Sequence, residues 1–68
     1  MRDANRIHPI CEKLERYWSQ WPDLRFGQFA YSFFKWIEYN KRLDPFYIED
    51  DRMLEYLKEY MKDKGVNV

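Results

Sequence analysis

Few residues in this chain have side chains that could do chemistry. His8 and Cys11 lie three positions apart, a spacing that places both on one face of a helix. A thiol becomes a good nucleophile only where a base, a cation or a metal lowers its pKa. Pro9 lies between the two residues, and the apolar Ile7 and Ile10 flank them. We therefore interpret Cys11 as a half-buried structural side chain and not as part of a reactive pair.

The acidic cluster Glu49, Asp50 and Asp51 is the other group with possible chemistry, since neighbouring carboxylates can hold a divalent cation. The cluster lacks the alternating ligands and the central glycine of a calcium loop. Acidic side chains are also favoured at the start of a helix, where free amides carry partial positive charge. One histidine and one cysteine are too few for a structural zinc site. We expect a helix start here, with no metal, no cofactor and no enzymatic activity.

Aromatic residues make up fourteen of the 68 residues, more rings than one small core can enclose. The surplus rings are expected at the surface, where clustered aromatic side chains mark interfaces. The predicted interface residues are Tyr31, Phe34, Lys35, Trp36 and Tyr39. This composition favours an interaction protein that binds a copy of itself or another protein.

Nucleic-acid binding is the alternative hypothesis. Lys35, Lys41 and Arg42 lie beside aromatic residues, as in surfaces on which bases stack. Twelve basic residues are balanced by twelve acidic ones, however, whereas a nucleic-acid-binding domain of this size is usually clearly basic. Any binding of nucleic acid by this chain is therefore expected to be weak.

Three helices are predicted to position these residues, because apolar residues recur at steps of three and four within 7–21, 26–37 and 53–61. Pro22 ends the first helix, and Asp23 is the expected N-cap of the second. Residues 44–48 are expected to form an extended strap over the core, before a last helix that Gly65 caps and after which the chain frays. The whole, residues 1–68, is predicted to be a single all-α domain of three helices.

The segment PDLRFGQ, residues 22–28, is predicted to be a structural joint between the first two helices. We interpret Gly27 as the position where an indole ring packs closely against the helix backbone. Gly27→Leu should therefore cost more stability than Gln28→Ala. Arg25 is expected to pair with Asp44, Glu49 or Asp50 and so to pin the strap. The predicted joint residues are Trp18, Trp21, Asp23, Arg25, Gly27 and Asp44.

Two sequence motifs, PDLRFGQ at 22–28 and DPFYIEDD at 44–51, resemble those of a known family. It comprises small uncharacterised proteins encoded in phages and prophages of Gram-positive bacteria, and the similarity runs over roughly residues 6–61. Residues 29–36 are more aromatic than the family pattern. The resemblance implies a phage-related origin and a cytoplasmic setting, and it carries no activity. No apolar run approaches the ~20 residues of a membrane span, so no membrane partner is expected.

Overall fold

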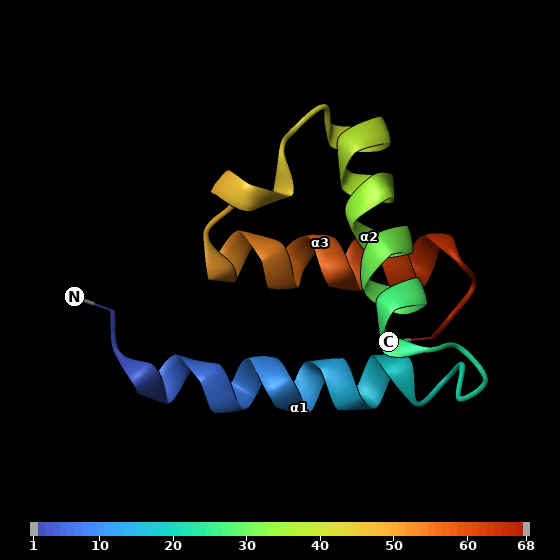
Figure 1. Ribbon diagram of the computed structural model, residues 1–68, viewed down its shortest axis with the longest axis horizontal. Helices are drawn as coiled ribbons and strands as arrows, with labels where there is room; N and C mark the ends of the chain where they lie inside the picture. Colours follow the sequence, from blue (N-terminus) through green and yellow to red (C-terminus); the bar gives the residue numbers. More distant parts are fainter. Residues whose placement is uncertain (1, 68) are drawn as a thin grey trace.

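The computed structural model describes residues 2–67, which form three α-helices and two short 3-10 turns (Figure 1). In chain order the elements are η1 (Ala4–Arg6), α1 (Ile7–Trp18), α2 (Phe26–Lys41), η2 (Pro45–Tyr47) and α3 (Asp50–Asp63). The predicted all-α, three-helix domain is confirmed.

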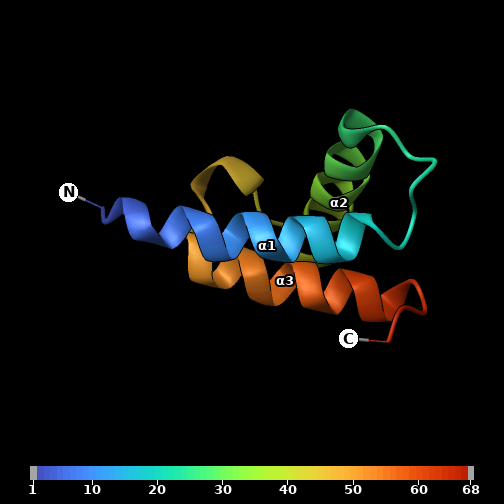
Figure 2. The same cartoon turned by 90° about the horizontal axis from the view of Figure 1, so that it is seen from below.

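The helices α1 and α3 run side by side in the same direction, and α2 crosses them (Figures 1 and 2). Two ion pairs join the beginnings of α1 and α3: Arg2 to Glu49 at 2.7 Å and Arg6 to Asp50 at 2.6 Å. Because all four side chains are exposed, each pair contributes about 0–1 kcal/mol. The acidic cluster thus begins α3, as expected, and also holds the start of the chain beside it.

The core lies where α2 crosses the other two helices. Phe29, Phe33 and Ile37 recur every fourth residue and form the buried stripe of α2. The remaining buried side chains are Tyr17 from α1 and Leu57, Tyr60 and Met61 from α3. Since α2 supplies three of these seven residues from one side, its opposite side is covered by neither α1 nor α3 within residues 2–67.

The tryptophans at the end of α1 hold the connection to α2, as expected for a joint. The Trp18 indole Nε1 donates a hydrogen bond of 2.8 Å to the carbonyl oxygen of Leu24. Its ring lies 5.5 Å from that of Phe26, and the ring of Trp21 lies 6.0 Å from that of Phe29. Both indoles therefore pack on aromatic side chains of α2.

The predicted role of Gly27 is wrong. A Cβ atom added at Gly27 would meet no atom within 4 Å, so no ring is seated there. The predicted N-cap is wrong as well, because α2 begins two residues later, with Arg25 as its N-cap. The amide of Arg25 donates to Oε1 of Gln28 at 2.8 Å, which satisfies one free donor at the helix start. Asp23 is an exposed residue of the connecting turn.

Arg25 does not pin the segment that follows α2. Within residues 2–67 it forms no ion pair with Asp44, Glu49 or Asp50. Asp44 instead accepts a hydrogen bond of 3.0 Å from the amide of Phe46 and caps η2. The two other carboxylates pair with the arginines that precede α1.

The open space at Gly27 removes the reason for expecting Gly27→Leu to cost more stability than Gln28→Ala. Gly27→Ala should raise the free energy of unfolding by about 0.4–1 kcal/mol, because alanine fits the open space and restricts the unfolded chain. Gln28→Ala should lower it by about 1 kcal/mol, because the Arg25 amide loses its partner. Urea unfolding of the two variants beside the parent measures both effects. A less stable Gly27→Ala protein would contradict the open environment.

The segment between α2 and α3 differs from the predicted strap. Its middle is the 3-10 turn η2, and only the residues on either side of that turn are extended. Phe46 and Tyr47 are 83% and 78% exposed, so they do not cover the core. Ile48 alone packs against the core, as was expected of the whole segment.

The helices α2 and α3 end on left-handed residues of different types. At the end of α3, Gly65 has φ 85° and its amide donates to Lys62 O, while the amide of Val66 donates to Met61 O. This Schellman arrangement brings Val66 against the core, so the expectation that the chain frays from Val66 is wrong at this residue; Val68 lies outside the described residues. At the end of α2, Arg42 adopts φ 58° although it is not a glycine.

Candidate interaction surface

Exposed apolar side chains gather on α2 and on the segment after it. Eight large apolar residues are exposed within the described part of the chain, and six of them lie between residues 31 and 47. We call these six the α2–η2 surface: Tyr31, Phe34, Tyr39, Leu43, Phe46 and Tyr47. Of the predicted interface residues, Tyr31, Phe34, Lys35 and Tyr39 are exposed.

The helical repeat of α2 explains why its rings divide between core and solvent. With Phe29, Phe33 and Ile37 buried, Tyr31 and Phe34 fall on the outward side of the helix. The Phe34 ring lies 5.6 Å from the Phe33 ring and reaches over the edge of the core. Phe34 also lines a shallow pocket with Glu38, Asp44, Pro45 and Phe46, which joins the outward side of α2 to η2.

The rings of η2 were not predicted to be part of an interface. Phe46 and Tyr47 lie edge to face with their centroids 4.9 Å apart, and both are more exposed than any ring of α2 except Tyr39. A signal was present in the sequence: aspartate followed by proline is typical of a helix start. A short turn beginning at Asp44 presents two successive rings to solvent.

Trp36 belongs to the contact between α2 and α3. It is half-buried, its Nε1 donates to Asp63 Oδ2 at 2.9 Å, and its ring lies 5.6 Å from that of Tyr60. Lys41 strengthens the same contact through a 2.7 Å bond to Glu59. Trp36 therefore holds α3 in place and does not contribute a free ring to the surface.

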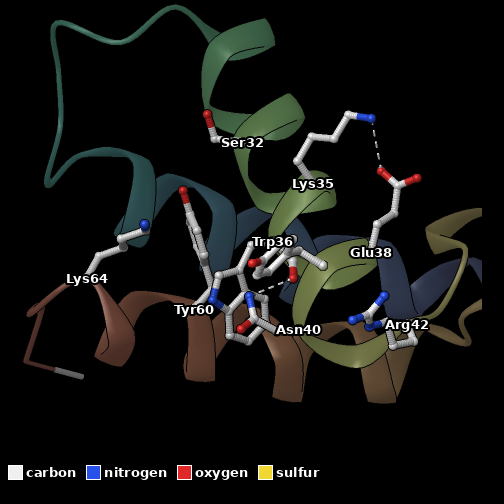
Figure 3. A pocket seen from close by; sticks show the side chains of 9 residues that line it. Ser32, Lys35, Trp36, Glu38, Asn40, Arg42, Tyr60 and Lys64 are labelled. Carbon is white, nitrogen blue, oxygen red and sulfur yellow. Dashed lines mark hydrogen bonds and ion pairs between the residues drawn. The ribbon is translucent and has the colours of Figure 1, made fainter.

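A shallow pocket lies beside this contact (Figure 3). Its lining mixes cations, one anion and aromatic rings: Ser32, Lys35, Trp36, Glu38, Tyr39, Asn40, Arg42, Tyr60 and Lys64. Lys35 and Glu38 pair at 3.5 Å on the outward side of α2. Burial raises the pKa of the Tyr60 hydroxyl, so it stays protonated at neutral pH. The charged and aromatic side chains of the lining could contact a ligand through ion pairs and ring stacking. The lining does not place a nucleophile beside a base.

The three cations of the nucleic-acid hypothesis do not form one patch. Lys41 faces α3, where its ammonium pairs with Glu59 and lies 5.3 Å from the ring centroid of Tyr56. Lys35 and Arg42 lie on the outward side, and Lys35 is already paired with Glu38. Two of the three cations proposed to contact a phosphate backbone are therefore already paired with carboxylates.

Cys11 is exposed, so the interpretation of a half-buried thiol is wrong. His8 pairs with Glu12 at 3.0 Å, one helical turn further along α1. Among residues 2–67 no group of three or more His, Cys, Asp or Glu side chains is placed to hold a metal ion.

Comparison with known proteins adds no relative: no family model, no curated protein and no solved structure matches the chain. Within the described residues, no helix has the length and apolar character required to cross a membrane.

Proposed function

We propose that this chain is a non-enzymatic interaction protein of phage or prophage origin that binds a second copy of itself or another protein through the α2–η2 surface. The observation that carries the proposal is the exposure of Tyr39, Phe46 and Tyr47, at 79%, 83% and 78%. The proposed origin is supported by the resemblance of the sequence motifs at 22–28 and 44–51 to those of the phage and prophage proteins.

The physical argument is the free energy of leaving aromatic area in water. Burying apolar surface contributes roughly 25 cal/mol per Å², and each aromatic side chain can bury about 150–250 Å². Aromatic side chains are enriched at protein–protein interfaces relative to the rest of the surface. Since α1 and α3 cover only the inner side of α2, a partner is the remaining means of covering the outer rings.

A double substitution in η2 tests this function. Phe46→Ser with Tyr47→Ser should weaken association at least about tenfold, because aromatic anchors carry much of the binding free energy at interfaces. The melting temperature should change little, since both rings are exposed. Light scattering over the micromolar range, with retention of bacterial proteins on a column of each variant, measures association.

Ile7→Ser is the matched control, because Ile7 is a large apolar side chain that is 50% exposed but belongs to α1 and not to the α2–η2 surface. It should associate like the parent. A parent chain that is monomeric throughout this range and retains no protein on the column would contradict the proposed function.

A further inference from the structure

Four residues on the outward side of α2 follow the spacing of a helix–helix seam. Tyr31, Lys35, Glu38 and Arg42 recur at steps of four, three and four, and all four are exposed. Steps of three and four residues place these side chains next to one another in one line along the helix. Lys35, Glu38 and Arg42 lie along one side of the helix in Figure 3.

We propose that this side of α2 packs against the same side of α2 in a second copy of the chain, antiparallel and about a twofold axis. The inference rests on the proposed function and names the second copy as the partner. Its basis is that the four residues are complementary to themselves. Lys35 and Glu38 lie at equal distances along the sequence from the midpoint between residues 36 and 37, and so do Tyr31 and Arg42.

A twofold axis at that midpoint makes every contact reciprocal. Lys35 then faces Glu38 of the second copy, an ammonium against a carboxylate. Tyr31 faces Arg42 of the second copy, which places a guanidinium against the face of a phenol ring. The 3.5 Å pair within each chain becomes part of a network of four charges.

The opposite orientation lacks this complementarity. Two parallel α2 helices in register would place Lys35 against Lys35, Glu38 against Glu38 and Arg42 against Arg42. Like charges facing each other across an interface are strongly unfavourable and exclude the wrong arrangement. The order of charges along α2 therefore selects the antiparallel pair.

The aromatic rings beside the seam fit the same symmetry. In an antiparallel twofold pair, each flank of the seam meets the same flank of the other copy. Phe34 and Phe46 lie on one flank, where they line a common pocket and are 40% and 83% exposed. The symmetry brings these rings together from both copies and covers Phe46, the most exposed ring of the α2–η2 surface.

Charge reversal tests the orientation and the partner together. Lys35→Glu makes the centre of the seam acidic, and Glu38→Lys makes it basic. Each variant alone should dimerise at least about tenfold more weakly than the parent, because its two copies repel. An equimolar mixture should form a heterodimer, since the carboxylate introduced in one chain faces the ammonium introduced in the other. Sedimentation and native mass spectrometry measure the species formed.

Lys58→Glu is the matched control, because it reverses an exposed cation on α3. It should dimerise like the parent, and circular dichroism should show that every variant is folded. Rescue in the mixture separates a contact between chains from the Lys35–Glu38 pair within one chain.

Two results would overturn the inference and leave the proposed function standing. One is a dimeric parent whose single variants still dimerise or whose mixture is not rescued. The other is a monomeric parent that retains a different protein through Phe46 and Tyr47. A monomeric parent that retains nothing contradicts both proposals.

Discussion

Replacing Phe29 by alanine should lower the free energy of unfolding by about 3–5 kcal/mol, the largest loss expected from a single truncation. Phe29 is 1% exposed and lies where the end of α1 meets α2. Its ring centroid is 6.5 Å from that of Trp18 and 6.0 Å from that of Trp21. Removing it leaves a cavity that both indoles border. Since small domains are stable by only about 5–15 kcal/mol, a large part of the protein should unfold near 37 °C.

Phe34→Ala is the control for this prediction, because it removes the same side chain from the same helix on the outward side. Phe34 is 40% exposed, and its removal should lower the free energy of unfolding by about 1 kcal/mol or less. Urea unfolding followed by circular dichroism compares the two variants. Equal losses would show that the core does not lie where the structure places it.

Trp18→Ala should have the second-largest effect, a loss of about 2–3 kcal/mol. Truncating a fully buried tryptophan costs about 3–5 kcal/mol, and Trp18 is half-buried. The variant loses the packing on Phe26 and also the hydrogen bond to the carbonyl of Leu24. Of the two tryptophans, only Trp21 then packs on an aromatic side chain of α2.

Trp18→Phe separates the two contributions, since it keeps a ring and removes the indole donor. Losing one hydrogen bond should cost about 0.5–1.5 kcal/mol. Thermal and urea unfolding of the alanine and phenylalanine variants give the difference that belongs to packing. A Trp18→Phe protein as stable as the parent would show that the bond to Leu24 contributes nothing.

The helices could be predicted from the sequence because their apolar residues repeat with the helical period. The start of α2 could not, because tertiary contacts decide it. Asp23 is a good N-cap by residue type, but the Leu24 carbonyl is held by the Trp18 indole and the chain continues as a turn up to Arg25. The environment of Gly27 also depended on which side of α2 faces α1, and a single sequence does not contain that information.

The interaction surface could be predicted in part for a similar reason. The period of α2 places Tyr31, Phe34, Lys35 and Tyr39 outside once its buried stripe is known. Trp36 lies at the edge of that stripe, and the position of α3 decides that it turns inward. Phe46 and Tyr47 were missed because an apolar segment was expected to cover the core, whereas Asp44 caps a turn that exposes both rings.

At Arg42, the stability of the single chain and the proposed dimerisation favour different residues. A left-handed residue with a side chain costs roughly 1–2 kcal/mol compared with glycine, so a designer who improved only the isolated fold would choose glycine at the end of α2. That choice would raise the melting temperature and remove the guanidinium that faces Tyr31 of the second copy in the proposed pair. Thermostability and self-recognition therefore make opposite demands on this residue.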